Sequence, residues 1–278
     1  DKPLCEHVYI ELSSGKRIRI TRIHTEEDAG KLVHTRGDTY VDYNRGGVPL
    51  IEIVTEPDIR SVDEIREYLE RLQLMMKYIG VSDCKMQEGS LRCDVNISVR
   101  KQGEEKLGTR TEIKNMNSFT FIEKAVAYEM DRQIDLIESG EAVVQETRRY
   151  NDADDVTESM RGKEDAHDYR YFREPDLVTI ATTGEEIETL RASLPELPDA
   201  RLKRYTEEWG IPAVDAQLLV KYRRVAEYFE EASQGVTPKT VSNFIIGQIF
   251  RRLSTDAEKE NADIPVPAAN LRELVALI

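Results

Sequence analysis

Two short segments in the middle of the chain combine polar side chains in a way that could bind a charged ligand. From Arg92 to Val99 polar and apolar residues alternate, which is typical of a strand. Its polar face consists of Arg92, Asp94, Asn96 and Ser98. A second segment, from Thr109, repeats the pattern with Arg110, Glu112 and Lys114. A solvated sheet face is the simplest explanation, but this mixture of acids, amides and bases suits a wall that holds a metal-bound phosphate ester.

A single carboxylate, Glu52, stands inside an apolar run that extends from Leu50 to Val54 and follows a Gly-Gly turn. A carboxylate in an apolar strand is costly unless it is paired, hydrogen-bonded or bound to a metal. A salt bridge to a nearby arginine, or a place on an edge strand, is the alternative explanation.

A third acid-bearing segment lies upstream, where a short alternating strand from Arg17 runs into His24 and the acids Glu26, Glu27 and Asp28. An acid run is usually only a solvated face. Three such segments on adjacent strands, however, favour a divalent-cation site of hard oxygen ligands, of the kind that magnesium takes with nucleotide phosphates.

Two helices are predicted beside these strands. Residues 62–79 carry an apolar stripe, with Ser61 as the N-cap and Gly80 after the end. A second stripe, with steps of three and four residues, follows Ser118 and ends before Gly140. We expect both helices to cover the apolar face of an antiparallel sheet and to leave its polar face open as a cradle. This is an α+β fold.

Near Leu194 the chain changes to helical patterns punctuated by prolines. We therefore expect two domains, a cradle domain over residues 1–190 and a small all-α helical domain over residues 191–278. Before the boundary, residues 146–175 show no period, which predicts a long loop. Its arginines are expected along the cradle rim, either bound to phosphates or paired with neighbouring acids: Arg148, Arg149, Arg161 and Arg170.

The bulk composition excludes several classes of protein. The 278 residues are 40% hydrophobic and 33% charged, and no apolar run approaches the roughly 18 residues of a membrane span. Three cysteines without CxxC spacing fit reduced thiols and a cytoplasmic location. The net charge of −14 argues against a protein that simply coats nucleic acid. Local basic clusters, which solvated helix faces explain equally well, are Arg201, Lys203, Arg204, Lys221, Arg223, Arg224, Arg251 and Arg252.

Several strings of residues are more specific than these patterns. HTEEDAGK begins at His24, NRGGVPLIEIVTEPDIRS at Asn44 and GVSDCKMQEGSLRCDVNISVR at Gly80, and TEIKNMNSF, QETRRY and DYRYFREPDL follow in that order. With them the chain closely resembles the B subunit of the tRNA-dependent amidotransferases, the GatB family. These enzymes convert Glu-tRNA(Gln) or Asp-tRNA(Asn) to the amidated aminoacyl-tRNA.

This resemblance implies a chemistry and a set of residues. The cradle of such subunits uses ATP and Mg2+ to phosphorylate the side-chain carboxylate of tRNA-bound Glu or Asp. Ammonia, released by the partner A (glutaminase) subunit, then displaces the phosphate, and a C subunit completes the assembly. Glu27 and Glu52 match the metal-ligand positions, and Asp94 matches an acid of the same cradle, so these three are the catalytic candidates. Arg92, Asn96 and Arg170 are the candidates for contacts to the nucleotide.

The chain also departs from the family pattern. It opens at Asp1 and stops at Ile278, so we expect it to lack the N-terminal part of the cradle and the C-terminal tail domain. In relatives the N-terminal part supplies a Glu-x-His pair that completes the metal site, so activity of the chain by itself is in doubt.

Two other functions remain open from the sequence. A non-catalytic adaptor could bind tRNA and dock a catalytic partner, with the acids in structural roles. A kinase-like or ATP-grasp-like ligase would also use acidic residues to bind a metal ion, but it would not contain the sequence strings that carry the family resemblance. A cation bound by Glu27 and Glu52 favours the enzyme, and a salt-bridged Glu52 remote from Glu27 favours the adaptor. The preference for Glu-tRNA or Asp-tRNA is undetermined.

Overall fold

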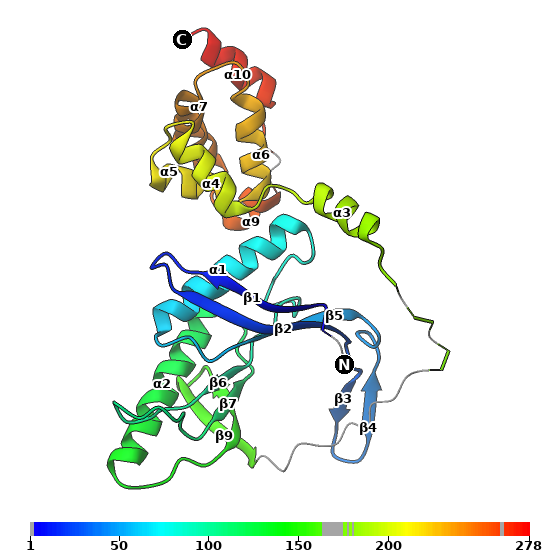
Figure 1. Cartoon of the computed structure of the whole chain (residues 1–278), viewed down its shortest axis with the longest axis vertical. Helices are drawn as coiled ribbons and strands as arrows, with labels where there is room; N and C mark the ends of the chain where they lie inside the picture. Colours follow the sequence, from blue (N-terminus) through cyan, green and yellow to red (C-terminus); the bar gives the residue numbers. More distant parts are fainter. Residues whose placement is uncertain (1–2, 163–174, 177, 180, 262–263) are drawn as a thin grey trace. The chain divides into compact units, whose positions relative to one another are not determined.

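The computed structural model describes residues 3–162, 175–176, 178–179, 181–261 and 264–278 (Figure 1). The chain forms two compact units, one from residues 1–72 with 92–165 and the other from residues 73–91 with 166–278. The first unit holds the strands, and the second is helical. This confirms the α+β class, while the predicted boundary between residues 190 and 191 falls inside the second unit.

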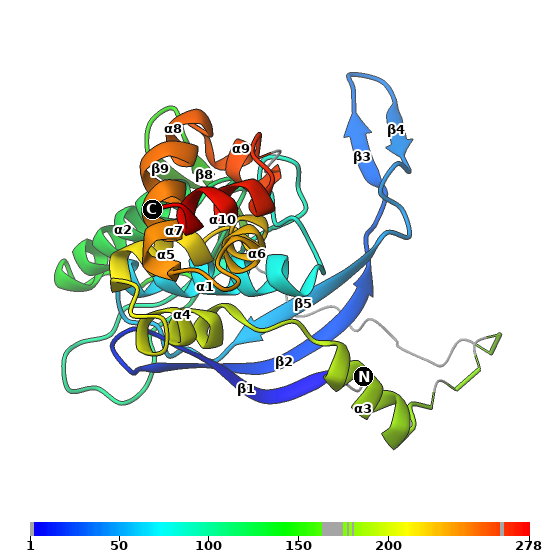
Figure 2. The ribbon, with the colours of Figure 1, turned by 90° about the horizontal axis from the view of Figure 1, so that it is seen from above.

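A three-stranded antiparallel sheet carries the first acid-bearing segments. Its strands are β1 (Cys5–Glu11), β2 (Arg17–Glu27) and β5 (Pro49–Thr55), in the order β1-β2-β5. One residue of β1, Ile10, and two alternate residues of β2, Ile18 and Ile20, are buried. Between β2 and β5 the chain makes a separate hairpin of β3 (Lys31–His34) and β4 (Thr39–Asp42), which Figure 2 shows extending from the ends of the two longer strands.

A second, four-stranded sheet contains the polar segments around Asp94 and Glu112. Its order is β6 (Val95–Ile97), β7 (Thr111–Lys114), β8 (Glu146–Asn151) and β9 (Val156–Gly162). The expected antiparallel arrangement holds for β6–β7 and β8–β9, but β7 and β8 are parallel. The reason is the connection, because helix α2 (Phe119–Glu138) carries the chain back across the sheet and only such a crossover can join parallel neighbours.

Both predicted helices of this part of the chain begin and end where the sequence signals indicate. Helix α1 is Val62–Ile79, and the Ser61 hydroxyl accepts the Glu64 amide at 3.3 Å. Helix α2 begins after Ser118, whose hydroxyl accepts the Phe121 amide at 3.1 Å. The residue Gly80 after α1 has a positive φ of 73°, a conformation that glycine adopts without strain.

Helices α1 and α2 contact different strands, and an ion pair between Arg66 and Glu123 also joins the two helices. Helix α2 packs against the four-stranded sheet through a face that includes Ile122, Ala125 and Val126 (Figure 1). Helix α1 is instead bonded to the β1–β2 turn, where Lys16 Nζ lies 2.8 Å from Glu64 Oε1. The chain between β5 and β6, which includes α1, separates the two sheets in sequence.

Strands β8 and β9 lie within the segment that the sequence predicts as a long loop, so that prediction is wrong for residues 146–151 and 156–162. The buried residues of these strands are mostly polar, beside the aromatic Tyr150. Thr147, Arg148 and Thr157 are all buried. A hydrophobic alternation is therefore absent, and a register shift between Thr147 and Arg148 also interrupts the alternation of buried and exposed positions in β8.

Arg148 and Thr157 are buried against one carboxylate of α2, whereas Thr147 donates to Glu112 at 3.1 Å on the other face of the sheet. Glu129 is fully buried and accepts hydrogen bonds from Thr111 of β7 at 2.9 Å and from Thr157 of β9 at 3.0 Å. Arg148 of β8 forms an ion pair with it at 3.2 Å. On α2 itself, Arg132 donates at 2.6 and 2.9 Å and Gln133 at 2.9 Å. Burial alone would raise the pKa of Glu129, but the bonds from Arg132, Gln133 and Thr111 hold it below its ordinary value.

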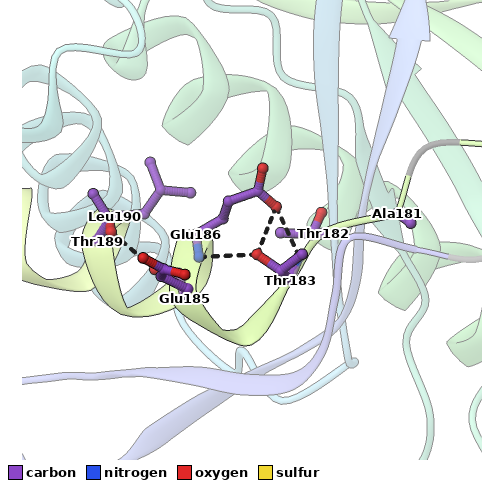
Figure 3. A pocket seen from close by; sticks show the side chains of 7 residues that line it. All are labelled: Ala181, Thr182, Thr183, Glu185, Glu186, Thr189 and Leu190. Carbon is purple, nitrogen blue, oxygen red and sulfur yellow. Dashed lines mark hydrogen bonds between the residues drawn. The ribbon is translucent and has the colours of Figure 1, made fainter.

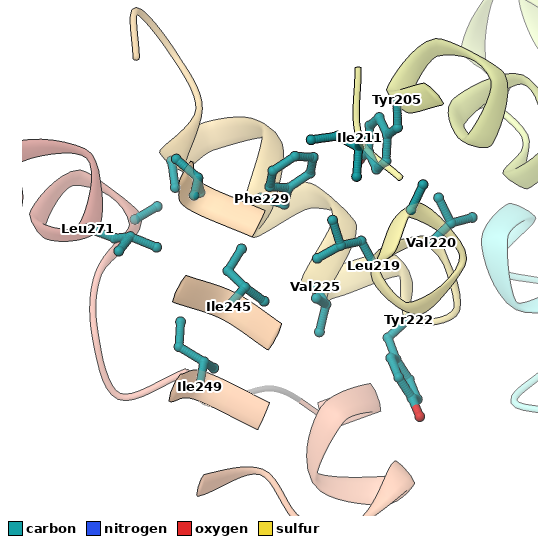
Figure 4. Packing of buried hydrophobic residues seen from close by; sticks show 14 of the residues in the cluster. Tyr205, Ile211, Leu219, Val220, Tyr222, Val225, Phe229, Ile245, Ile249 and Leu271 are labelled. Atoms are coloured by element: carbon teal, nitrogen blue, oxygen red, sulfur yellow. The ribbon is translucent and has the colours of Figure 1, made fainter. Parts of the chain in front are cut away.

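The second unit is helical, and its helices other than α3, in which no residue is buried, lie around one apolar core (Figure 4). They are α3 (Gly184–Ser193), α4 (Pro198–Glu207), α5 (Ala213–Val220), α6 (Arg223–Ala232), α7 (Pro238–Phe244), the π-helical turn η1 (Ile245–Ile249), α8 (Phe250–Arg252), α9 (Asp256–Asn261) and α10 (Ala268–Ala276). Leu219, Phe229 and Ile245 lie at the centre of the core. Trp209 packs against it and stacks on Tyr205 with 5.1 Å between ring centroids.

Removing the charge of Glu129 is expected to loosen the four-stranded sheet. Glu129→Gln leaves Arg132 and Arg148 without their shared carboxylate, which should cost about 3 kcal/mol. Because the folded pKa is lowered, this contribution is present above the ordinary glutamate pKa and is lost as the pH falls through the folded value. Hydrogen exchange of the β7 and β8 amides should therefore be faster in Glu129→Gln at neutral pH, with a smaller difference from wild type at acidic pH. The exposed Glu138→Gln of the same helix is the control, and equal exchange in the two variants would contradict the expectation.

Candidate metal and nucleotide site

Strand pairing brings three possible metal ligands together on one face of the three-stranded sheet. His24 and Glu26 alternate along β2, and Glu52 of β5 lies opposite His24. His24 Nε2 is 2.8 Å from Glu26 Oε1 and 3.2 Å from Glu52 Oε2. One ligand atom from each residue lies within 4.8 Å of the other two. We call these three residues the acid–histidine cluster.

The chemistry of the acid–histidine cluster fits a divalent cation. Nε2 of His24 faces two carboxylates at once, while its Nδ1 is buried and has no hydrogen-bond partner among the described residues. Two carboxylates leave most positions of a magnesium ion for water or phosphate oxygens, as is usual for that ion. The imidazole also admits other divalent metals. The side chains of Glu26 and Glu52 are 45% and 48% exposed, so a ligand has access to the cluster from solvent.

Both alternative explanations for Glu52 also have support. Strand β5 is an outer strand of its sheet in the described part of the chain, and Arg22 Nη2 lies 3.9 Å from Glu52 Oε2. That distance is at the limit of an ion pair and longer than the contact of Glu52 with His24. Exposed pairs of this kind contribute little to stability. The acid–histidine cluster is therefore the more specific environment of Glu52.

Glu27, which the family resemblance assigns to the metal, lies elsewhere on β2. It is paired in register with Pro49, one position away from Glu26, so it projects from the opposite face of the strand. Its role as a ligand stays a prediction. His24 and Glu26 were noticed in the sequence but not chosen as ligands. Their signal is the spacing of two residues, which becomes informative only once the register with Glu52 is known.

Asp94 and Asn96 lie on the open face of the other sheet. Asn96 is paired with Glu112 across β6–β7, and both project away from the face that α2 covers. Lys114 Nζ lies 2.9 Å from Asp94 Oδ2. Strand β6 spans three residues, shorter than predicted, although exposed and half-buried residues alternate from Arg92 to Ile97. Among the described residues, Asp94 is outside the acid–histidine cluster.

Arg92 connects the approach to β6 with the end of β2. Its guanidinium donates to the Asp28 carboxylate, and Arg45 Nε lies 3.7 Å from the same group. The hydrogen bond from Arg92, with the charges of both arginines, holds the pKa of Asp28 below its ordinary value against the opposing effect of burial. Asp28 is four residues beyond His24, so Arg92 ties the open face of one sheet to the strand that carries the cluster.

The predicted arginines of the cradle rim separate into different roles. Arg148 is buried under α2, where its Nε donates to Thr157 at 2.8 Å, so its prediction as a rim residue is wrong. Arg149 is exposed and donates to Glu158 at 2.7 Å. The side chain of Arg161 and the whole of Arg170 lie outside the described residues, so the nucleotide contact expected of Arg170 stays a prediction.

Several basic residues of the second unit form ion pairs within that unit. Arg204 Nη2 lies 2.6 Å from Glu230, Arg223 Nε lies 2.7 Å from Glu227, and Lys221 Nζ lies 3.0 Å from Asp256. Arg201 is buried. This agrees with the simpler explanation of these clusters as helix-face charges, and it does not test RNA contacts.

A pocket at the start of α3 offers no comparable set of groups (Figure 3). Its hydrogen bonds are those of a capping box, in which the Thr183 hydroxyl accepts the Glu186 amide and the Glu186 carboxylate accepts the Thr183 amide. These contacts stabilise the helix start. Among the helices in the described ranges, none is both long and apolar enough to cross a membrane.

Comparison with known proteins gives consistent matches. A family model described as the GatB/GatE catalytic domain matches residues 1–188. Three relatives are named as B subunits of aspartyl/glutamyl-tRNA(Asn/Gln) amidotransferases. The protein of Carboxydothermus hydrogenoformans is 50% identical and that of Caldanaerobacter subterraneus subsp. tengcongensis 51% identical, each over all of this chain and 60% and 59% of the relative. That of Lachnospira eligens is 53% identical over 92% of this chain and 55% of the relative. The chain thus spans about 60% of the length of the curated relatives that it matches.

Metal titration should separate the acid–histidine cluster from the family-based assignment. Glu26→Gln and Glu52→Gln remove one oxygen ligand each and should weaken Mn2+ binding at least about tenfold, measured by electron paramagnetic resonance of the free ion. Glu27→Gln, on the other face of β2, is the matched control and should bind as wild type does. If Mn2+ binding required Glu27 and not Glu26, the ligand assignment based on the β2–β5 register would be wrong.

Proposed function

Because the chain belongs to the GatB/GatE catalytic-domain family, we propose that it provides the phosphorylating site in the B subunit of a tRNA-dependent amidotransferase. The observation that carries this proposal is the acid–histidine cluster, which lies inside the residues that match the catalytic-domain family. The names of the relatives, which describe B subunits of aspartyl/glutamyl-tRNA(Asn/Gln) amidotransferases, support the same assignment.

The proposed reaction begins with activation of a carboxylate. When bound, magnesium and ATP supply charge neutralisation and the phosphoryl group that activates the side chain of tRNA-bound Glu or Asp. On this chain, His24, Glu26 and Glu52 would hold the cation. Glu27, the position that the resemblance assigns to the metal, lies on the other face of β2 and is not needed for this cluster. Asp94 and Asn96 offer an acid and an amide for nucleotide contacts on the open sheet face. The activated ester must be kept from water until ammonia arrives, because water would hydrolyse it.

The proposal includes partners that supply what this chain lacks. Among its residues no serine or cysteine constellation for releasing ammonia from glutamine is evident in the sequence. A glutaminase A subunit would supply ammonia, and a C subunit would complete a heterotrimer in the cytoplasm. The substrates would be tRNA(Gln) or tRNA(Asn) charged with Glu or Asp, and the choice between them is left open.

A non-catalytic adaptor is the second candidate, and one contact favours it. Arg22 near Glu52, together with Glu27 on the opposite strand face, matches what an adaptor with structural acids would have. It does not account for a histidine held between two carboxylates that are open to solvent. A structural acid gains nothing from that exposure.

Activity of the assembled enzyme distinguishes the two functions. In the full-length subunit with its A and C partners, Glu52→Gln is expected to lower ATP hydrolysis dependent on Glu-tRNA(Gln) by about a hundredfold or more. Basal glutaminase activity should be retained, because it belongs to the partner. Glu11→Gln, an exposed acid that pairs with Arg17 on the same sheet, is the control and should keep both activities. Survival of tRNA-dependent hydrolysis in Glu52→Gln would favour the adaptor.

A further inference from the structure

Four charged side chains, Asp94, Lys114, Arg149 and Glu158, lie in a single row across the open face of the four-stranded sheet. Asp94, just before β6, meets Lys114 of β7, which is paired in register with Arg149 of β8. Arg149 is in turn paired with Glu158 of β9, whose carboxylate accepts from Arg149 Nη2 at 2.7 Å. From β6 to β9 the charges therefore run acid, base, base, acid. We call this set the charged row.

All members of the charged row project from the face opposite α2. The neighbouring residues Ile113, Arg148 and Thr157 are buried, the latter two against Glu129 of α2. Successive side chains of a strand point to opposite faces, so Lys114, Arg149 and Glu158 point to solvent. The side chains of Lys114 and Arg149 are 38% and 56% exposed, which leaves their charged ends accessible.

The two central cations are placed where like charges repel. Neighbouring strands lie about 4.8 Å apart, and like charges on directly opposite residues destabilise a sheet. Asp94 and Glu158 flank the pair from outside, and Glu112 Oε1 lies 3.6 Å from Lys114 Nζ. Strands β7 and β8 are direct neighbours, so nothing in the row itself separates the charges of Lys114 and Arg149. Burial alone would lower the pKa of Lys114, but Asp94 and Glu112 raise it above its ordinary value, so the ammonium stays charged at neutral pH.

We propose that Lys114 and Arg149 together form a subsite for a phosphoryl oxyanion, carried either by a nucleotide or by an RNA backbone. A phosphate presents several oxygens and can accept from both cations at once, which turns their repulsion into a shared attraction. The Arg149 guanidinium offers planar paired donors, and the Lys114 ammonium acts as a compact point charge. Asp94 and Glu158 hold the two cations in place and compete with the ligand for them.

The subsite lies on the same open face as Asp94 and Asn96, so the inference deepens the proposed function and rests on it for the identity of the ligand. The prediction that the subsite binds phosphate depends only on the residues of the charged row. A first test therefore needs no catalytic activity, and a second uses the assembled enzyme to identify the source of the phosphate.

The first experiment titrates inorganic pyrophosphate into the 278-residue chain by calorimetry. Lys114→Met and Arg149→Gln should each weaken binding about tenfold, since each removes a charge-assisted donor. Glu158→Gln should tighten binding, because it releases Arg149 from its competing acid. The matched control is Lys124→Met, an exposed lysine whose Nζ lies 2.9 Å from Asp155 on another surface. Equal weakening by Lys124→Met would show an effect of net charge only and would overturn the subsite, as would unchanged binding in Lys114→Met and Arg149→Gln.

The second experiment measures the full-length assembly with the same variants. If the ligand is the nucleotide, KM for ATP should rise about tenfold while the Kd for tRNA is unchanged. If the ligand is the RNA backbone, the Kd for tRNA should rise and its salt dependence should fall by about one unit of slope, with KM for ATP unchanged. If neither the KM for ATP nor the Kd for tRNA changed, the proposed role of the subsite in this enzyme would be overturned. If the wild-type assembly itself had no tRNA-dependent ATP hydrolysis, the proposed function would fail while the pyrophosphate titration still judged the subsite.

Discussion

The carboxylate of Glu129 holds one residue from each of three strands, and the open sheet face depends on that arrangement. Thr111, Arg148 and Thr157 belong to β7, β8 and β9, and each is followed by a residue that projects from the opposite face. A buried charge is tolerated only when its partners are complete, and leaving it unpaired is far more costly than an ordinary lost contact. The lateral positions of Glu112, Arg149 and Glu158 are therefore fixed from behind. The hydrogen bonds and ion pair of the buried Glu129 thus fix the positions of the charged side chains on the opposite, open face of the sheet.

The parts of the fold that the sequence predicted are those with local signals. The bounds of α1 and α2 follow from Ser61, Ser118 and the apolar stripes between them and the following glycines. Strands β8 and β9 were missed because their buried faces hold Arg148 and Thr157, which give no hydrophobic alternation. The parallel pairing of β7 with β8 also has no local signal, since it arises only when α2 crosses the sheet. Prediction from hydrophobic patterns therefore located the elements that bury apolar side chains. It missed the strands whose buried side chains are held by hydrogen bonds.

In the candidate site, too, some residues could be predicted from the sequence and others only from the strand pairing. Glu52 could be singled out from the sequence because a lone acid in an apolar run is unusual. The choice among Glu26, Glu27 and Asp28 could not be made in that way, because a shift of one residue moves a side chain to the other face of a strand. Only the pairing of His24 with Glu52 identifies Glu26 as their neighbour. The same parity separates the buried Arg148 from the exposed Arg149, two adjacent residues of identical chemistry.

The β3–β4 hairpin lies between the strands that carry the acid–histidine cluster, and its base is closed by two backbone bonds. The Asp28 amide donates to Val48 at 2.8 Å, and the Gly47 amide donates to Asp28 at 2.9 Å. The entropic cost of closing a loop grows only with the logarithm of its length. With the base closed, residues can be added to or removed from the hairpin without shifting His24 relative to Glu52. The ligand geometry and the projecting ribbon are thus separable modules, so the ribbon can be shortened or exchanged to redesign its surface while the metal ligands keep their register.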